Sequence, residues 1–346
     1  MRQRLDYIDG LRGLAASLVV AQHALENIQF GGNTQYRALT DYVNWGRFGV
    51  VLFFLISGAV IPFSFGGASP IRNFAVSRFF RLYPAYWLSL PLVVLASIHF
   101  GGRVYSADIY IANLSMLQGL WGFPDVSGPY WTLKFEILFY VLCAVLFWRG
   151  RLESPHVIGA LALAFSIVAM AADLSGRHGL TAKLPLWMLM FALGMLIRQA
   201  FVGENRTAKQ WLAVLVPLAV VAGLVFGGTF YRIPDNSDRF LTPIATSAGN
   251  ILPIFLFIII LWAKPVFGAP ILYLGKISYS LYLFQAIGLL IVAALIAPQQ
   301  WPVGYLLAVL AISVALASLT YRYVEKPAID MGRSVARRHQ SASMPV

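Results

Sequence analysis

Ten long apolar stretches constrain this chain more than any other feature. Only 12% of its 346 residues are charged and 59% are apolar, whereas about a quarter of the residues in a typical soluble domain are charged. A helix of roughly 20 apolar residues crosses a bilayer, so the composition excludes a soluble globular domain and a disordered chain. It predicts an all-α, polytopic integral membrane protein with about ten transmembrane helices in the lipid bilayer. We place these spans at 11–28, 48–66, 82–100, 131–148, 157–173, 185–201, 211–228, 243–262, 271–297 and 303–321.

Two stretches depart from a simple span. Lys276 and its polar neighbours interrupt 271–297, so this helix is expected to begin nearer Ile277. The stretch 105–123 is apolar but carries several polar side chains. Such a pattern is typical of an interfacial or re-entrant helix.

The basic excess indicates orientation. The chain has 26 Lys and Arg against 14 Asp and Glu, a net charge of +12, which in a membrane protein reflects cytoplasmic loops rather than a nucleic-acid partner. With the N-terminus inside, most basic residues fall on cytoplasmic segments, so both termini are predicted to be cytoplasmic. We predict one transmembrane domain, 1–330, and a short basic tail, 331–346. Cys143 is the only cysteine, which excludes an intrachain disulfide and a cysteine metal site.

The first predicted span carries a polar stripe with a histidine. His23 follows Arg12 by 11 residues, which returns to within roughly 20° of the same helix face after a rise of about 16 Å. Glu26 is three residues further on and shares that face. Ionisable groups inside a span point to function, and a neutral imidazole can take a proton from a hydroxyl. Two interpretations stay open: a catalytic or proton-relay histidine, and one that only bonds a neighbouring helix.

Glu136 is the second ionisable group within a predicted span. If Trp131 marks the outer interface, Glu136 lies about 22 Å from the inner surface of a core about 30 Å thick. The depth of His23 is about 16 Å on the same scale. A carboxylate beside an imidazole orients it and stabilises its cation, so we predict a contact between the two, direct or through water. The alternative is an interfacial pair of Glu136 with Lys134.

A basic run precedes the third predicted span. Arg78 and Arg81 lie three residues apart at a predicted cytoplasmic helix start, with Arg72 upstream. Arginine forks suit phosphate groups, so the run is a candidate donor site, with the positive-inside bias as the alternative. Glu325, after the last span, is expected to pair with nearby arginines.

Further polar side chains lie in the apolar helices. Ser278, Tyr282 and Gln285 recur at helical spacing, which fits either a polar cavity or hydrogen bonds between helices. Ser57 precedes Gly58, and these small residues favour close helix packing. The predicted supporting or pore residues are Glu26, Ser57, Ser278, Tyr282 and Gln285.

Six segments together resemble the membrane acyltransferase-3 family, in the family's order over about residues 5–330. Arg12 and His23 have the family's spacing of ten intervening residues. The resemblance implies ten helices and transfer of an acyl group, commonly acetyl, from cytosolic acyl-CoA as co-substrate, with no tightly bound cofactor or metal. The usual acceptor is a hydroxyl of a carbohydrate on a surface or secreted glycan, which can be lipid-linked, and the implied location is a bacterial inner membrane. The matching segments are 7–13, 49–58, 78–84, 131–140, 275–283 and 323–327.

The resemblance also implies roles for single residues. It makes His23 the catalytic group, as a general base or as the carrier of a covalent acyl intermediate. The carboxylate that orients His23 is predicted to be Glu136 or Glu26, and the catalytic role of Glu136 rests mainly on its depth. The residues on the side of the acyl-CoA donor are Arg12, Arg78 and Arg81, with Arg72 added from the same basic run.

Two positions depart from the family pattern. The family often has an acidic residue where this chain has Val51, and histidine where it has Gln285. No role rests on these positions, so His23 is the only histidine that the family pattern places. The segment 323–346 is too short for the hydrolase-like domain that many relatives carry, which predicts a stand-alone form.

Two other function classes compete with acyl transfer. A proton-coupled secondary transporter would use the buried His and Glu as a relay, but the sequence shows none of the inverted repeats common in transporters. A membrane glycosyltransferase would need acidic metal ligands near the surface, for which Asp6 and Asp9 have only a generic spacing.

Overall fold

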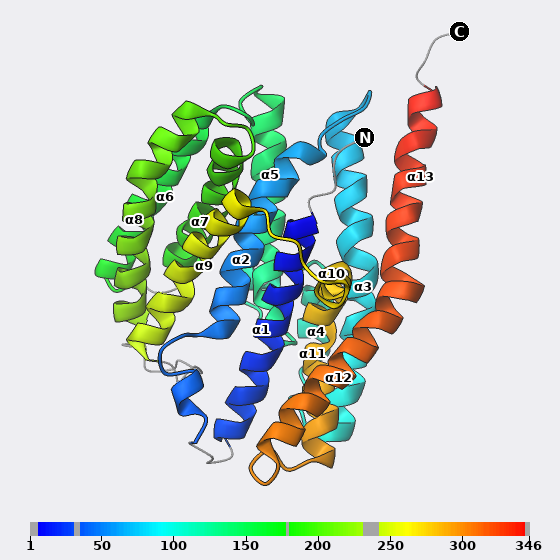
Figure 1. Ribbon diagram of the computed structural model, residues 1–346. Coiled ribbons are helices and arrows are strands. Elements are labelled where there is room, and N and C mark those ends of the chain that lie inside the picture. Colours follow the sequence, from blue (N-terminus) through cyan, green and yellow to red (C-terminus); the bar gives the residue numbers. More distant parts are fainter. Residues whose placement is uncertain (1–5, 31–34, 178–179, 231–241, 343–346) are drawn as a thin grey trace. The chain divides into compact units, whose positions relative to one another are not determined.

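A computed structural model describes residues 6–30, 35–177, 180–230 and 242–342 (Figure 1). Within these ranges the chain forms helices and turns, without a strand. Nine helical segments of the described residues are long and apolar enough to cross a membrane. The predicted all-α, polytopic membrane architecture is confirmed.

The predicted spans correspond to helices in the same order along the chain. The first of them, α1, is helical as predicted but falls outside the nine apolar segments, because its second half carries several polar side chains. The bounds are α1 (Asp6–Phe30), α2 (Trp45–Val60), α3 (Pro70–Phe100), α5 (Leu133–Trp148), α6 (Pro155–Leu174), α7 (Leu180–Phe201), α8 (Arg206–Phe230), α9 (Pro243–Ala263), α11 (Ser278–Leu295) and α12 (Pro302–Thr320).

The start of α3 corrects one prediction. We expected this span to begin at residue 82, with the basic run outside it, but the helix begins at Pro70. Proline is favoured in the first turn of a helix because it lacks an N–H that would be unsatisfied there anyway. Arg72, Arg78 and Arg81 therefore lie inside α3, along its first three turns.

Three short or unusual elements complete the chain. A break at Ile277 separates α10 (Ala269–Lys276) from α11, which confirms the expected start of the ninth span. The stretch 105–123 contains only the seven-residue helix α4 (Ala107–Asn113) and the 3₁₀ turn η3 (Gln118–Leu120). At the C-terminal end the helix α12 continues through the π-helix η5 (Tyr321–Glu325) into α13 (Lys326–Ala342). The boundary that we placed at residue 330 falls inside α13.

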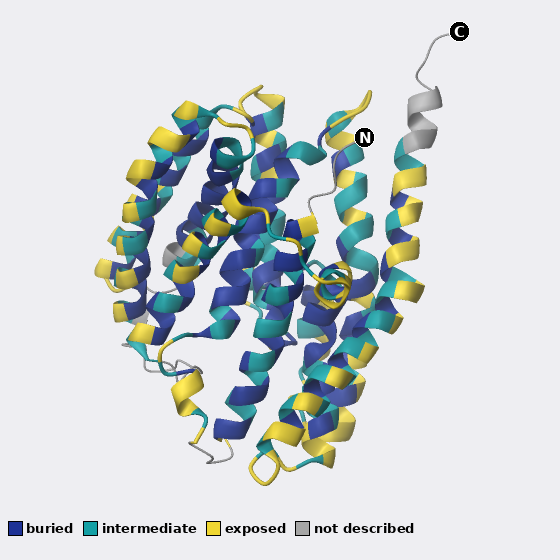
Figure 2. Cartoon of the chain, in the orientation of Figure 1, coloured by how far each residue is buried: buried dark blue, intermediate teal, exposed yellow. Residues whose placement is uncertain are grey.

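The chain divides into two compact units. Unit 1 comprises Met1–Pro62 and Arg149–Lys276, and unit 2 comprises Phe63–Trp148 and Ile277–Val346. The most buried spans, α2 and α7, belong to unit 1, while α6 and α8 of the same unit each keep an exposed face (Figure 2). In unit 2, α3 packs against α11 and α13, and α11 packs against α12.

Glycines bring the helices of unit 1 into close contact. A Cβ atom at Gly58 of α2 would lie 2.0 Å from the Phe191 carbonyl oxygen of α7, and one at Gly194 would lie 2.1 Å from the Leu55 oxygen. Such contacts exclude any larger residue, as at other close crossings of membrane helices. The predicted close packing around Ser57 and Gly58 is confirmed.

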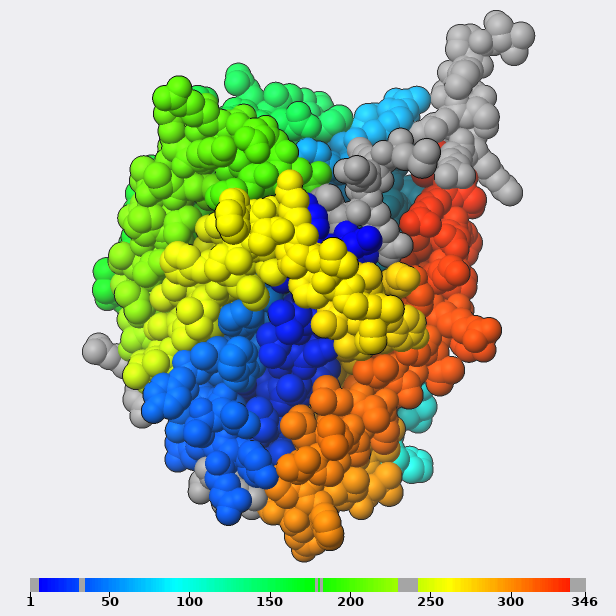
Figure 3. Space-filling model, in the orientation of Figure 1, coloured from blue at the N-terminus to red at the C-terminus, as the bar shows by residue number. Residues whose placement is uncertain are grey.

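Glycines also allow close backbone contacts between α1 and α10. A Cβ atom at Gly275 would lie 1.9 Å from the Asp9 carbonyl oxygen, and one at Gly13 would lie 2.4 Å from the Ile271 oxygen. The segment 264–268, which leads from α9 to α10, lies on the surface of unit 1 (Figure 3). Helix α1 is thus held on two sides, by α2 and by α10, which fixes the polar stripe that it carries.

Candidate active site

The strongest candidate site of unit 1 is centred on His23, in the second half of α1. Its Nδ1 atom lies 2.9 Å from Glu26 Oε2, one helical turn further on. The side chains are 34% and 23% exposed, respectively, so neither is sealed in the core. A hydrogen bond from Nδ1–H to the carboxylate leaves the lone pair on Nε2, the atom that then accepts a proton.

Gln22 positions the Glu26 carboxylate, which in turn positions His23. Its Nε2 atom donates a hydrogen bond of 3.0 Å to Glu26 Oε1, and its Oε1 atom accepts one of 3.1 Å from the Trp45 backbone N–H at the start of α2. Gln22 is 1% exposed, so the chain from α2 to the imidazole is anchored in the protein. We call Gln22, His23 and Glu26 the histidine cluster.

Arg12 lies on the same continuous helix as the histidine cluster. Both lie within α1, as predicted, about 16 Å apart along its axis. The Arg12 side chain is partly buried. The helix therefore connects a basic group near its beginning with a candidate proton acceptor in its second half.

Glu136 belongs to unit 2, where its side chain accepts a hydrogen bond from a tyrosine. Tyr140 donates a hydrogen bond of 2.5 Å from its hydroxyl to Glu136 Oε1, one turn along α5. The alternative pair of Glu136 with Lys134 is wrong, because Lys134 pairs with Asp125 instead. The contact of Glu136 with His23 remains a prediction.

The arginines of α3 have different surroundings. Arg81 forms an ion pair of 3.3 Å with Glu325 Oε1, and the other oxygen of Glu325 accepts a hydrogen bond of 2.5 Å from the Ser280 hydroxyl. The expected pairing of Glu325 with an arginine is confirmed. Glu325 is fully buried and ends the π-helix η5. Such π-turns often occur at functional positions in helices.

Arg78 and Arg72 lie on the same helix without a carboxylate within ion-pair distance among the described residues. The Arg78 guanidinium lies over the rings of Phe74 and Tyr140, at 5.7 and 5.8 Å from their centroids, an arrangement that favours a cation. The Arg72 side chain is exposed. Both retain N–H groups for an anionic partner.

The polar residues of α11 bond other elements of unit 2. Tyr282 donates a hydrogen bond of 2.6 Å to the Pro129 carbonyl oxygen and lies 2.8 Å from the Thr132 hydroxyl. Gln285 donates a hydrogen bond of 3.0 Å to the Tyr282 carbonyl oxygen of the same helix. Ser278 is buried. For Tyr282, this favours hydrogen bonding between elements over the lining of a cavity.

Several residues of these clusters were not predicted from the sequence. Gln22 is not among the predicted site residues, although its spacing of four residues from Glu26 is a helical pairing signal. Tyr140 has the same spacing from Glu136. Among the described residues, no three His, Cys, Asp or Glu side chains come together as a metal site would require.

Comparison with known proteins identifies the class of this chain. A family model described as an acyltransferase domain matches residues 5–322. The chain belongs to this acyltransferase-3 family. It is an acyltransferase of the membrane, and the match covers α1 through α12, including the histidine cluster and the arginines of α3.

Known relatives are similar over almost the whole chain. Nodulation protein 10 of Rhizobium leguminosarum bv. viciae is 24% identical and aligns with 97% of this chain and 96% of its own length. A protein of Komagataeibacter xylinus, named as a proposed membrane-bound transacylase, BcsY, is 27% identical over 98% of this chain and 87% of its own. One of Staphylococcus aureus, named as a proposed O-acetyltransferase, is 24% identical, and the alignment spans 58% of its length. No solved structure matches this chain.

Proposed function

We propose that this acyltransferase transfers an acyl group, acetyl in the simplest case, from cytosolic acyl-CoA to a hydroxyl of a carbohydrate acceptor. The family supports acyl transfer, and the name of the Staphylococcus aureus relative supports an oxygen nucleophile and an acetyl group. A carbohydrate offers such hydroxyls at a membrane surface, either on a secreted glycan or on a lipid-linked one. The basic excess inside, predicted from the charge distribution, supports a bacterial inner membrane with the donor on its cytoplasmic side.

The observation that carries this proposal is the 2.9 Å contact of His23 Nδ1 with Glu26. Because the Glu26 carboxylate accepts a hydrogen bond from Nδ1–H, the lone pair of the imidazole is on Nε2, which acts as the base. Glu26 then stabilises the imidazolium that forms. Glu26 takes the orienting role for which we had also considered Glu136, and it does so within one helix.

The reaction at His23 proceeds by addition and elimination. Nε2 removes the proton from the acceptor hydroxyl while the oxygen attacks the thioester carbonyl carbon. The tetrahedral intermediate collapses, the C–S bond breaks, and the CoA sulfur takes the proton back from the imidazolium. A second route uses Nε2 itself as the nucleophile, with an acyl-imidazole that the acceptor hydroxyl then opens. Both routes place the same nitrogen at the reacting carbon.

The arginines bind the phosphates of the donor in this proposal. Arg72 and Arg78 offer N–H groups without a carboxylate within ion-pair distance among the described residues, and Arg12 lies on the helix that carries His23. Arg81 contributes the side of its guanidinium that is turned away from Glu325. Arginine suits phosphate because its planar fork forms paired hydrogen bonds.

The test is release of free CoA by the purified protein in liposomes, with acetyl-CoA as donor and a disaccharide such as cellobiose as acceptor, and with longer acyl-CoAs tried next. We expect release by the wild type and its loss in His23→Ala. Arg333→Gln is the matched control, because Arg333 is an exposed basic residue of α13 paired only with its neighbour Asp330 among the described residues. A folded His23→Ala protein that releases CoA at the normal rate would refute both routes.

A further inference from the structure

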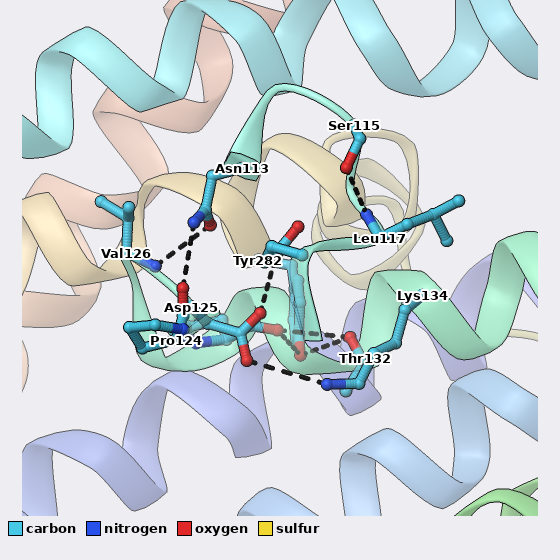
Figure 4. A network of polar contacts seen from close by, with 11 residues as sticks. Asn113, Ser115, Leu117, Pro124, Asp125, Val126, Thr132, Lys134 and Tyr282 are labelled. Carbon is cyan, nitrogen blue, oxygen red and sulfur yellow. Dashed lines mark hydrogen bonds and ion pairs between the residues drawn. The ribbon is translucent and has the colours of Figure 1, made fainter. Parts of the chain in front are cut away.

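A second polar cluster lies in unit 2, in the segment that leads from α4 to α5. We call Gln118, Asp125, Ser127 and Lys134 the loop site. Asp125 and Lys134 point toward one another (Figure 4), and their charged atoms are 3.9 Å apart. Gln118 donates a hydrogen bond of 2.5 Å from Nε2 to the other oxygen of Asp125. Neither the mechanism nor the family match assigns a role to these residues.

The backbone of the loop site is held in a fixed arrangement. The Asn113 side chain is fully buried, donates to the Pro124 carbonyl oxygen at 3.0 Å and accepts from the Val126 N–H at 3.1 Å. These bonds clamp the chain on both sides of Asp125. The same clamp is visible in Figure 4. A site that is fixed before its ligand arrives loses less entropy on binding.

Two buried polar atoms of the loop site have no hydrogen-bond partner among the residues that the structure describes. They are Gln118 Oε1 and the Ser127 hydroxyl, on side chains that are 0% and 4% exposed. Leaving such an atom unsatisfied destabilises the fold, and native proteins keep few of them. The two atoms are therefore places where a ligand hydroxyl gains a bond that the protein alone does not make.

Lys134 offers further donors. Its distance of 3.9 Å from Asp125 is too long for a hydrogen bond, and no other described residue accepts one from its ammonium group. The side chains of Lys134 and Asp125 are 12% and 20% exposed, so solvent reaches this pair. Burial raises the pKa of the Asp125 carboxyl, against the opposing effects of Lys134 and Gln118.

The charges of the loop site define the kind of ligand. Asp125 and Lys134 cancel each other, so the site offers no net attraction to the phosphates of acyl-CoA. It presents a carboxylate and an amide oxygen as acceptors, an ammonium group as donor, and a hydroxyl that does both. Trp121, directly after the η3 turn, is 60% exposed, and aromatic rings of this kind expose an apolar face to solvent.

We propose that the loop site binds hydroxyl groups of a neutral carbohydrate. The inference rests on the proposed function, because that carbohydrate is the acceptor of the acyl group. A hydroxyl of the sugar ring donates to Asp125 and accepts from Lys134, and so bridges the 3.9 Å gap between them. The loop site is thereby a specificity determinant in unit 2, separate from the histidine cluster of unit 1.

The experiment is hydrogen–deuterium exchange of the full-length protein in nanodiscs. The probes are maltose, cellobiose and N,N′-diacetylchitobiose, and acetyl-CoA serves as the anionic comparison. We expect at least one sugar to slow amide exchange in segment 113–134, and acetyl-CoA to leave that segment unchanged. If none of the three sugars protects the segment, or if acetyl-CoA protects it equally, the proposal is overturned.

Matched variants test the residues themselves. Asp125→Asn with Lys134→Gln keeps the net charge and the size of the side chains, and we expect it to weaken sugar binding about tenfold or more. Gly119→Ala is a milder probe, because its methyl group would lie 2.4 Å from Lys134 Nζ and so displace the flexible end of that side chain. Asp108→Asn, an exposed acid on α4, should bind sugar like the wild type. Unchanged binding in both loop-site variants would leave only ordered water to satisfy these atoms and would refute the proposal.

Failure of this inference is separable from failure of the proposed function. CoA release that depends on His23, with no sugar protecting segment 113–134, would refute the loop site alone. Sugar protection that depends on Asp125 and Lys134, with no CoA release from any acyl-CoA in the presence of that sugar, would support the site while refuting acyl transfer from CoA.

Discussion

The histidine cluster of unit 1 and the Arg81–Glu325 pair of unit 2 are both acid–base contacts inside a membrane protein, but they are built in opposite ways. His23 and Glu26 lie within one turn of a single helix and are 34% and 23% exposed. Arg81 and Glu325 come from two segments far apart in the sequence, with Ser280 from a third, and their side chains are 26% and 0% exposed. The first arrangement leaves both partners partly exposed and within reach of a substrate, while the second buries its carboxylate completely.

This difference predicts that substitutions in the histidine cluster change activity, while substitutions in the Arg81–Glu325 pair change stability. An exposed pair contributes little to folding because water competes with it, so substitution there should alter activity and spare stability. Removing one partner of a buried pair leaves an uncompensated charge, which is strongly destabilising. The following predictions test whether the two sites divide in this way.

The largest effect is expected at His23. His23→Ala should lower the rate of CoA release by about 10²–10⁴-fold, the usual contribution of a general base, while the apparent Tm stays within about 1 °C of the wild type. Rates are measured in liposomes and Tm by fluorescence-detected unfolding of the same preparation. A loss of activity that is matched by a collapse in Tm would assign His23 to folding instead.

The next effect is expected at Glu325, with the opposite signature. Glu325→Leu should lower the free energy of unfolding by about 2–4 kcal/mol, because Arg81 then loses its ion-pair partner. The double variant Arg81→Met with Glu325→Leu should regain most of that loss, since both charges are gone. Unfolding is followed by denaturant titration in detergent. Equal destabilisation of the single and double variants would mean that the ion pair is not the cause.

The contrast also explains what the sequence could predict. His23, Glu26 and Arg12 share one helix, so their spacing alone placed them on one face. Glu325 was expected to pair with nearby arginines, but which one depended on how α3 and η5 pack. The start of α3 was misplaced by twelve residues, because its basic first turns have the composition of a cytoplasmic loop. The loop site was not predicted. Asp125 and Gln118 lie in an irregular segment, and such a segment has no helical repeat from which their contact could be inferred.

A smaller effect is expected at Glu26. Glu26→Gln should lower the rate of CoA release about ten- to hundredfold, because an amide can still bond Nδ1 but no longer stabilises the imidazolium. The apparent Tm should change little, since Glu26 is 23% exposed. Glu136→Gln, measured in parallel, tests the carboxylate that we first predicted for this role. A larger loss for Glu136→Gln than for Glu26→Gln would move the orienting role to unit 2.

The smallest effect is expected at Gln22, and it places a limit on the contrast between the two sites. Gln22 is 1% exposed and links Glu26 to the start of α2. It is therefore buried like Glu325, but it contacts a residue of its own helix, as His23 does. Gln22→Met keeps the volume but removes both hydrogen bonds, which should slow CoA release about two- to fivefold and cost about 1 kcal/mol of stability. Gln22→Glu tests the same position with the shape preserved. CoA release by Gln22→Glu should be slower than by Gln22→Met. The new carboxylate repels Glu26, and the substitution also removes the amide group that donates to it. If Gln22→Met has the rate and stability of the wild type, then Glu26 positions His23 unaided, and the histidine cluster reduces to two residues on one turn of α1.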